Sequence, residues 1–471
     1  MILTKKTKVV CTIGPATETE EKLTELLKAG MNVMRLNFSH GDFEEHGARV
    51  TNFRAAMKKT GMSGAILQDL SGPKIRIGDF YKERVTLVPG STFTLYTEEK
   101  VVGDETKAWI NYPTLADELQ VGSAVLLDDG KKRFEVTAIK KGKVVCKVIV
   151  GGETKGRRGV NLPGAYLKVS SITDKDRKDL QFGIKHKVDF IALSFVRRAE
   201  DIHELRAMLK KAKSTARIIA KIETQEAIDN LEMIIVATDG VMVARGDLAI
   251  EVPAEKVPLI QKKIIKICNA LGKPVITATQ MLESMIKSPI PTRAEVSDVA
   301  NAILDGTDAI MLSEESTLGD YPVEAVKMMS RIAGEIEHHA EPRALHMIPN
   351  THMAGDSISG AAVHVADEVQ SQLIVALTMN GKTARMVSRF KPRQNIIAVT
   401  PNDVAYAQAV LSYGVTPLKV GSFKTLPDAL KEVRSALVKN KMAAKNDTVV
   451  ITGGVPFGAG HGTNMLLVET I

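Results

Sequence analysis

Four charged side chains between residues 221 and 251 are spaced so that they could bind a metal ion and an anionic substrate. Lys221 and Glu223 follow one short apolar run, and Arg245 and Asp247 follow the next. We interpret the runs as parallel strands joined by a helix, because a right-handed crossover places the carboxyl ends of such strands side by side. Carboxylates beside cations there suit a divalent metal and an anion. The alternative is a salt-bridge network, but charges on two successive strands favour the site.

Polar side chains also follow nearly all the remaining apolar runs of the predicted barrel, which is described below. Loops are polar in general, so one polar strand end carries little information. Carboxylates, cations and hydroxyls after six different strands are harder to assign to stability alone, and an active site is the better interpretation. These side chains are Arg35, Asn37, Ser39, His40, Asp69, Lys221, Glu223, Arg245, Asp247, Thr279, Gln280, Ser313 and Glu315.

The elements that must position these residues alternate regularly. Eight short apolar runs, each followed by a helical pattern, predict a (β/α)₈ barrel, whereas a doubly wound sheet usually has fewer strands. Thr17, Thr173 and Thr292 each precede an acidic residue by three positions, which predicts capped helix starts. From 71 to 170 the helical period disappears and short β-type runs alternate with glycine turns, which indicates an inserted β domain.

We therefore expect three domains. The barrel would comprise residues 1–70 and 171–341, and the β insert residues 71–170. After a linker rich in proline, apolar runs again alternate with helical segments, which predicts an α/β domain at 342–471. A chain of 471 residues is long enough for this division.

Composition narrows the classes of function. The chain is 44% apolar and 25% charged, as in ordinary globular proteins. Its net charge of +8 is dispersed, which favours a solvated surface over nucleic-acid binding. No run of eighteen apolar residues predicts a membrane span, and the first residues lack the apolar stretch of a signal peptide. Three scattered cysteines without metal-ligand spacing predict a reducing compartment, and we expect a cytoplasmic protein.

Seven motifs, taken in chain order, resemble those of the pyruvate kinase family. They are MRLNFSHG, DLSGPKIR, GVNLPG, KIE, VMVARGDLAIEV, ITATQMLESM and PTRAEVSDVANAILDGTDAIMLSEES. The resemblance spans all three predicted domains. It implies phosphoryl transfer from phosphoenolpyruvate to ADP, giving pyruvate and ATP in glycolysis, by a homotetramer. It also implies that the insert is a mobile lid of β-barrel type and that the last domain binds effectors.

The resemblance assigns roles to residues at matching positions. Glu223 and Asp247 match the ligands of Mg²⁺ (or Mn²⁺), as oxygen donors that leave positions open for substrate and water. Lys221 matches the lysine that steadies the moving phosphoryl group, and Arg35 matches a phosphate-binding arginine. These residue types suit a reaction that depends on positioning and on neutralising charge.

Further matches concern the substrate carboxylate, the proton and the lid. Gly246, which has no side chain, would let backbone N–H groups approach the carboxylate. Thr279 lies where the enolate is protonated, directly or through water and Ser313. Arg76 and Arg158 lie in the two hinges of the lid, although the family usually has lysine at the second position. The nucleotide-binding assignments are Asn37, His40, Arg76 and Arg158, and the substrate assignments are Arg35, Lys221, Gly246, Asp247 and Thr279.

The segment at 69–74 departs from the family pattern. Members that need K⁺ usually have threonine and glutamate where Leu70 and Lys74 stand, although the side-chain ligands Asn37, Ser39 and Asp69 are present. We expect the ammonium of Lys74 to replace the monovalent cation, so that activity does not require K⁺. The alternative is that Lys74 is a solvated lid residue.

Glu314 stands where many relatives have glycine or alanine. An additional carboxylate near the metal could disturb it. We expect Glu314 to point into solvent instead, because adjacent residues at a strand end face opposite ways.

Two polar, glycine-containing loops follow apolar runs in the last domain, at 378–385 and 452–464. Ala376 stands where a P-loop needs its first glycine, so we reject that motif. The first loop's backbone donors and lysine suit a phosphate, whereas the glycines of the second fit simple turns equally well. Together with the resemblance, they predict a sugar phosphate or nucleotide effector. The candidate contacts are Thr378, Lys382, Thr383 and Arg385.

Two other functions would explain part of the sequence. A metal-dependent lyase or aldolase acting on phosphoenolpyruvate or a 2-oxo acid would explain Glu223 and Asp247, but not the insert with Arg76 and Arg158. A degenerate barrel that senses phosphometabolites or binds RNA would fit the positive net charge, but the intact catalytic positions argue against it.

Overall fold

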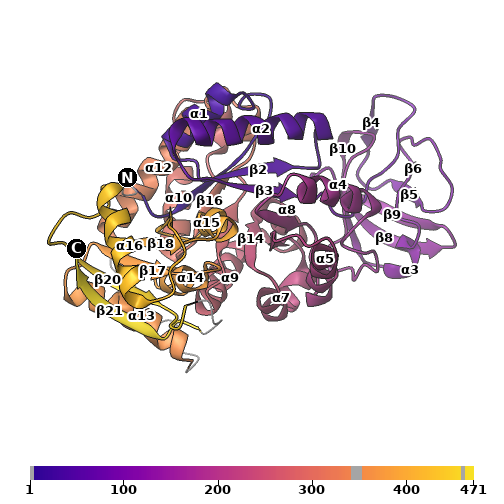
Figure 1. The fold of residues 1–471 in the computed structure, drawn as a ribbon. Helices are drawn as coiled ribbons and strands as arrows, with labels where there is room; N and C mark the ends of the chain where they lie inside the picture. Colours follow the sequence, from indigo (N-terminus) through magenta and orange to yellow (C-terminus); the bar gives the residue numbers. More distant parts are fainter. Residues whose placement is uncertain (1–4, 341–352, 458–461) are drawn as a thin grey trace.

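The computed structural model describes residues 5–340, 353–457 and 462–471. A barrel lies in the middle of the molecule, with the β insert at one end and an α/β sheet at the other (Figure 1). The predicted (β/α)₈ barrel, β insert and C-terminal α/β domain are confirmed. Most of the predicted linker and part of the loop at 452–464 lie outside the described residues. None of the described helices is long and apolar enough to cross a membrane.

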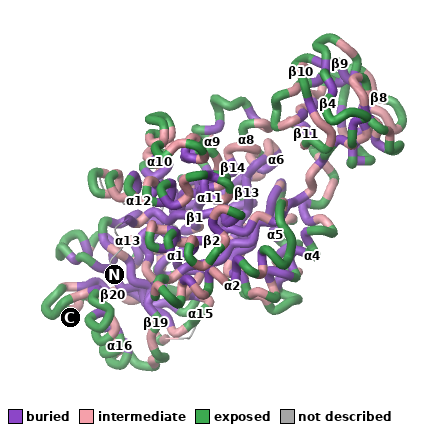
Figure 2. Tube along the Cα trace, turned by 90° about the horizontal axis from the view of Figure 1, so that it is seen from above, coloured by how far each residue is buried: buried purple, intermediate pink, exposed green. Residues whose placement is uncertain are grey.

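Eight parallel strands form the closed barrel, in the order β1-β16-β15-β14-β13-β12-β3-β2. The register continues across the closure, where Val10 of β1 pairs with Met311 of β16 and with Val33 of β2. The strands are β1 (Lys8–Thr12), β2 (Val33–Asn37), β3 (Ala65–Asp69), β12 (Phe190–Leu193), β13 (Arg217–Ile222), β14 (Gly240–Ala244), β15 (Val275–Ala278) and β16 (Ala309–Leu312). They form the most continuously buried part of the chain (Figure 2).

Helices surround the barrel, and side chains cap several of their first turns. Thr173 and Thr292 form capping boxes with Asp176 and Glu295, as predicted. The predicted cap at Thr17 is wrong, because the helix starts later and Thr19 caps it. The helices are α1 (Glu20–Ala29), α2 (Phe43–Thr60), α4 (Asp174–Lys185), α5 (Ala199–Lys211), α6 (Gln225–Asp229), α7 (Leu231–Ala237), α8 (Arg245–Glu251), η1 (Ala254–Lys256), α9 (Val257–Leu271), η2 (Glu283–Ile286), α10 (Arg293–Asp305), α11 (Glu314–Thr317) and α12 (Pro322–His339).

Side-chain alternation along the strands places the candidate site at the barrel mouth. Ile219 belongs to the apolar cluster inside the barrel, and residues two apart on a strand share a face. Lys221 and Glu223 therefore continue that inner row at the carboxyl end. Val33 and Leu67 belong to the same cluster, so Arg35 and Asp69 follow on the inner face of their own strands.

The insert consists of a six-stranded sheet, β11-β7-β8-β9-β5-β6, and a two-stranded sheet, β10-β4, which share one apolar core. Its partners are distant in sequence: β5 pairs with β9, and β11 pairs with β7. The elements are β4 (Arg84–Leu87), β5 (Thr92–Tyr96), β6 (Lys107–Trp109), α3 (Leu115–Glu118), β7 (Ala124–Leu127), β8 (Lys132–Lys140), β9 (Lys143–Val150), β10 (Gly152–Lys155) and β11 (Val160–Asn161).

The C-terminal domain has a five-stranded sheet, β19-β18-β17-β20-β21, in which only the pairing of β20 with β21 is antiparallel. It packs against the amino end of the barrel, where Lys391 contacts Asp308 at 2.7 Å and Lys8 Nζ donates to Val415 O at 2.7 Å. The elements are α13 (Ala354–Glu368), β17 (Leu373–Leu377), α14 (Lys382–Ser388), β18 (Asn395–Thr400), α15 (Asp403–Ala409), β19 (Val415–Lys419), α16 (Leu426–Lys439), β20 (Thr448–Gly453) and β21 (Met465–Thr470).

Candidate active site

Lys221 lies at the centre of a buried polar cluster in the barrel mouth. Its ammonium is 2.8 Å from Glu223 Oε1 and 3.4 Å from Asp69 Oδ1, and it donates to Ser194 Oγ at 2.7 Å. Burial alone would lower the pKa of Lys221, but the two carboxylates outweigh it and raise the pKa above the ordinary value. Lys221 is therefore a fixed positive charge in a site shielded from water.

Arg35 is held beside this cluster by two partners. Its Nε and Nη2 lie 2.8 and 2.7 Å from Asp69 Oδ2, and its Nη1 donates to Thr12 Oγ1 at 2.7 Å. Burial would raise the pKa of the Asp69 carboxyl, but Lys221 and Arg35 hold it below the usual value. Asp69 thus stays ionised and orients both cations.

Glu223 and Asp247 offer the carboxylate oxygens that a divalent metal prefers. Oε2 of Glu223 accepts the backbone N–H of Phe195 at 2.8 Å, whereas its buried Oε1 forms an ion pair with Lys221 at 2.8 Å. Burial and the nearby charge of Asp247 raise the pKa of Glu223. A cation between the two carboxylates would relieve both effects. In the described residues, no group of three His, Cys, Asp or Glu side chains could hold a metal.

Thr279 is held in a strained backbone conformation next to Gly246. Its φ is +69°, a left-handed conformation that is unusual for a β-branched residue. The hydroxyl accepts the N–H of Gly246 at 2.8 Å and donates to Ala278 O at 2.6 Å. Arg245 supports this turn, because its Nη2 donates to Thr279 O at 2.7 Å.

Arg245 differs from the other three charges of the 221–251 stretch. We expected it to meet them at the mouth, but its Nη1 contacts Asp298 Oδ1 at 2.7 Å and its Nε donates to Ala278 O. Arg245 therefore braces the end of β15.

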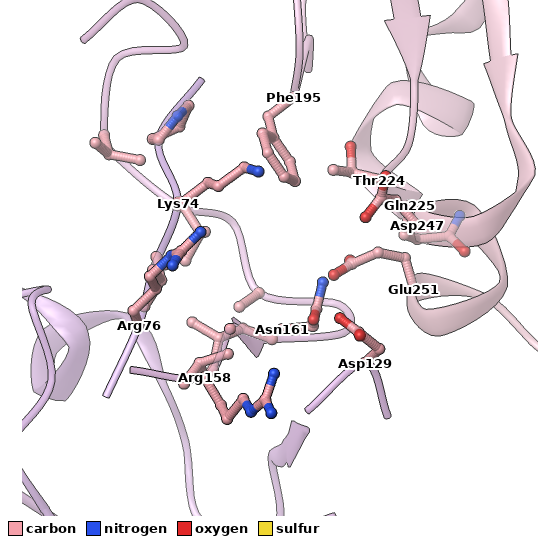
Figure 3. A pocket seen from close by; sticks show the side chains of 18 of the residues that line it. Lys74, Arg76, Asp129, Arg158, Asn161, Phe195, Thr224, Gln225, Asp247 and Glu251 are labelled. Carbon is pink, nitrogen blue, oxygen red and sulfur yellow. The ribbon is translucent and has the colours of Figure 1, made fainter. Parts of the chain in front are cut away.

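A cavity of about 540 Å³ lies between the barrel mouth and the insert (Figure 3). The barrel contributes His40 and Asp247, and the insert with its hinges contributes Lys74, Arg76 and Arg158. Arg158 Nε is 3.3 Å from Asp128. The structure thus brings three of the four predicted nucleotide-binding residues to one cavity, whereas Asn37 is not part of its lining.

Several oxygen atoms in the predicted K⁺ region already have partners within the protein. Lys74 is half-buried, and burial followed by the charges of Lys221 and Arg76 lowers its pKa. Asn37 Oδ1 accepts the backbone N–H of Ser39 at 3.1 Å. Leu70 is buried, and its carbonyl accepts the hydroxyl of Ser194 at 2.7 Å.

The side chain of Glu314 lines the cavity, and its charge acts on His40. The residue is exposed to solvent, as expected, although it also borders the cavity. Because α11 starts at Glu314, the alternation of a strand no longer applies at this position. The next residue is buried instead: Glu315 accepts the backbone N–H groups of Ser313 at 2.7 Å and Leu282 at 3.1 Å, which ties two strand ends together.

A second cavity, of about 310 Å³, lies in the C-terminal domain. Thr378, Lys382 and Thr383 line it, together with Thr463, whose hydroxyl donates to Thr383 Oγ1 at 3.1 Å. Arg385 is not part of this lining. It lies close to Arg217, and burial followed by that neighbouring charge lowers its pKa to about 9.

Two residues of the polar cluster were not predicted from the sequence. Thr12 contacts Arg35, and Ser194 contacts Lys221 and Leu70 O. Each lies two positions after an inward-facing residue, Val10 or Ala192. The period of two along a strand was therefore the signal that could have identified them.

Comparison with known proteins gives one consistent family. The model for the pyruvate kinase barrel domain matches residues 4–326, and that for the pyruvate kinase alpha/beta domain matches residues 356–469. The pyruvate kinase of Geobacillus stearothermophilus is 47% identical over 99% of this chain and 80% of its own length. That of Clostridium perfringens is 43% identical over 99% of this chain and 100% of its own. The crystal structure of a pyruvate kinase from Cryptosporidium parvum matches with a TM-score of 0.95 and 36% identity, over 99% of this chain and 96% of that one.

Proposed function

This chain belongs to the pyruvate kinase family, and from that premise we propose how its residues transfer the phosphoryl group of phosphoenolpyruvate to ADP. The products are pyruvate and ATP, and the reaction is a step of glycolysis. The observation that carries the proposal is the contact of Lys221 with Glu223 and Asp69, beside a cavity that Asp247 lines.

Lys221 steadies the phosphoryl group as it moves. Its charge is fixed by Asp69 and Glu223, and Ser194 sets its position. A cation held in a buried site stabilises charge on the phosphoryl oxygens more than a solvated cation does. Arg35 binds phosphate oxygens beside it, since Asp69 holds its planar guanidinium in one orientation.

Glu223 and Asp247 would hold the divalent ion that the family requires, and we propose Mg²⁺, or Mn²⁺, because their donors are hard oxygens. Such an ion supplies neutralisation of the charge on substrate oxygens. A substrate carboxylate that takes the N–H of Gly246 would release the hydroxyl of Thr279 from that hydrogen bond. We infer that the Thr279 hydroxyl then turns its proton from Ala278 O toward the enolate, and delivers it directly or through water and Ser313 while taking a replacement proton from water.

The lid closes the nucleotide side of this site. His40, Arg76 and Arg158 are the candidate contacts for the phosphates of ADP, together with Asn37 from the end of β2. Closure excludes water and strengthens these contacts.

A coupled assay tests this function directly. With Mg²⁺, phosphoenolpyruvate and ADP, we expect pyruvate and ATP in equal amounts. A lyase or aldolase of the same fold would form no ATP. Adding fructose bisphosphate, hexose or pentose monophosphates and AMP in turn tests the effector proposal below.

We further propose that turnover does not depend on K⁺. Lys74 already places a cation in the site next to Lys221 and Arg76, so a monovalent ion would meet repulsion there. Asp69, one of the side chains matched to K⁺ ligands, is engaged by Arg35 and Lys221.

Turnover in buffer free of Na⁺ and K⁺ is therefore expected to be unchanged by added KCl. The matched variant Lys74→Glu removes the cation and adds a carboxylate, and we expect its turnover to rise many-fold with KCl. A many-fold rise for the parent protein would refute the proposal.

The cavity of the C-terminal domain supports the proposal of a phosphorylated effector. Lys382, with the hydroxyls of Thr378 and Thr383, offers a cation and donors to a phosphate at one wall. Arg385 stays a proposed contact only if its side chain moves. No activation by any compound of the panel would count against this role.

The remaining proposals rest on the sequence pattern and, for the homotetramer, on the family. We propose a cytoplasmic homotetramer that binds neither nucleic acid nor membrane. We also propose the domain limits 1–70 with 171–341, 71–170 and 342–471.

A further inference from the structure

Glu251 has no role in the chemistry described above, although it lines the same cavity. It is the last residue of α8, the helix that follows β14 and carries Asp247. Residues four apart in a helix lie on the same face, one turn from each other. The side chains of Asp247 and Glu251 therefore belong to one helix, and a displacement of that helix moves both of them.

The carboxylate of Glu251 crosses from the barrel to the lid. It accepts hydrogen bonds from the side chain of Asn161 and from the backbone N–H of Leu162. Figure 3 shows Glu251 directed toward Asn161, on the far side of the cavity from Lys74 and Arg76. Asn161 ends β11, whose partner in the lid sheet is β7, and Leu162 belongs to the lid core. Glu251 thus holds the second hinge of the lid at the point where the chain leaves the lid sheet.

The loop after β7 adds a second contact with the same helix. Asp128, Asp129 and Gly130 all have left-handed backbone conformations, with φ of +58°, +54° and +81°. This tight turn brings the lid so close to α8 that a Cβ on Gly130 would lie 3.7 Å from Ile250 Cγ2. Two successive residues of α8, Ile250 and Glu251, therefore meet the lid.

The surroundings of Glu251 disfavour a charged carboxylate, which a residue with only a packing role would not need. Burial raises its pKa to about 7, and the charges of Asp247 and Glu223 add to this effect. A neutral side chain at this position would avoid that cost. A carboxylate, in turn, accepts stronger hydrogen bonds than a neutral group, which suits a contact that must hold a moving domain.

We propose that Glu251 is a positioning residue that latches the lid to the helix of Asp247, so that closing the lid and placing the metal ligand are one movement. This inference rests on the proposed function, because it takes Asp247 as a metal ligand. Glu251 does not touch the reacting atoms, and its effect on turnover passes through Asn161, Leu162 and the helix.

Kinetics of matched variants test the effect on turnover. Loss of both hydrogen bonds in Glu251→Ala is expected to lower kcat/KM about tenfold and to raise the Mg²⁺ concentration needed for half-maximal rate. Glu251→Gln should retain most of the activity, because its amide oxygen can accept the same two bonds. The control Glu255→Ala removes an exposed carboxylate just beyond α8 and should behave like the parent.

Hydrogen exchange of the same proteins tests the latch without relying on catalysis. The amide of Leu162 is expected to exchange faster in Glu251→Ala than in the parent or in Glu255→Ala. Asn161→Ala should change kinetics in the same direction, and combining it with Glu251→Ala should cost less than the two separate losses added together. Melting curves identify any variant that fails to fold. If Glu251→Ala fails to fold, Asn161→Ala carries the test, with Glu251→Gln as its control.

The possible results distinguish the latch, its role in positioning and the proposed function from one another. Unchanged exchange at Leu162 in Glu251→Ala would refute the latch, whatever the kinetics. Faster exchange with the parent's kcat/KM and Mg²⁺ dependence would show a structural contact only and refute the positioning role. If the parent forms no ATP, the proposed function fails, while the exchange data still decide whether Glu251 holds the lid.

Discussion

Replacing Asp247 with alanine is expected to lower ATP formation about 1000-fold or more, as large a loss as removing one charge-stabilising group from an active site. Asp247 lines the cavity on the first turn of α8, and its charge reaches Glu223, Lys221 and Lys74. Without it, the proposed pair of metal ligands would be reduced to Glu223. We therefore expect the Mg²⁺ requirement to rise steeply, and excess Mg²⁺ or Mn²⁺ to recover part of the rate.

The control for this variant is Glu232→Ala, which removes an exposed carboxylate from α7. It should leave the rate and the Mg²⁺ dependence unchanged. Because Asp247 is only half-buried, its loss should have little effect on the melting temperature. An Asp247→Ala protein that forms ATP at the parent's rate would contradict the assignment of the metal site and with it the whole mechanism.

The sequence was sufficient for the parts of the site that depend on strand period. Lys221, Glu223, Arg35 and Asp69 follow inward-facing residues by two or four positions, so an apolar run followed by charge was enough to place them. The barrel itself followed from eight such runs. Ser194 and Thr12 obey the same rule, but a single hydroxyl after a strand does not differ from ordinary loop composition.

Other features depended on contacts that no local pattern encodes. Arg245 is long enough to reach several partners, and only the packed structure shows that Asp298 and the end of β15 hold it. Glu314 borders the cavity while exposed to solvent, and a helix rather than a strand begins there. In the insert, strand order depends on partners far apart in the chain, such as β5 with β9, and short strands choose partners by packing more than by propensity.

The second large effect is expected for Lys221→Met, which keeps most of the side chain's length but removes its charge. We expect kcat to fall by a factor on the order of 10³ to 10⁵, the range found when a cation is withheld from a transferring phosphoryl group. Lys221→Arg is the matched variant that keeps the charge. It should recover only part of the rate, because the guanidinium does not fit the position set by Ser194.

The loss of kcat must be separated from a loss of stability, because the charge of Lys221 offsets two buried carboxylates. Without it, Arg35 still pairs with Asp69, whereas the pKa of Glu223, already raised by burial, would rise further. A carboxyl whose folded pKa is raised destabilises the folded state as pH rises above its unfolded value, here 4.5. The unfolding free energy of Lys221→Met should therefore fall increasingly below the parent's as pH rises from 5 to 8, by up to about 3–5 kcal/mol. Melting curves at each pH would show this as a growing decrease in melting temperature.

Measuring kcat well below the melting temperature at each pH then isolates the chemical effect. If the variant is folded and still binds phosphoenolpyruvate and Mg²⁺ but does not turn over, Lys221 acts on the phosphoryl group during transfer. A kcat close to the parent's would assign Lys221 to structure alone. Because the parent's Lys221 has a raised pKa, its charge persists across this pH range, so any change in the parent's rate there must come from other groups.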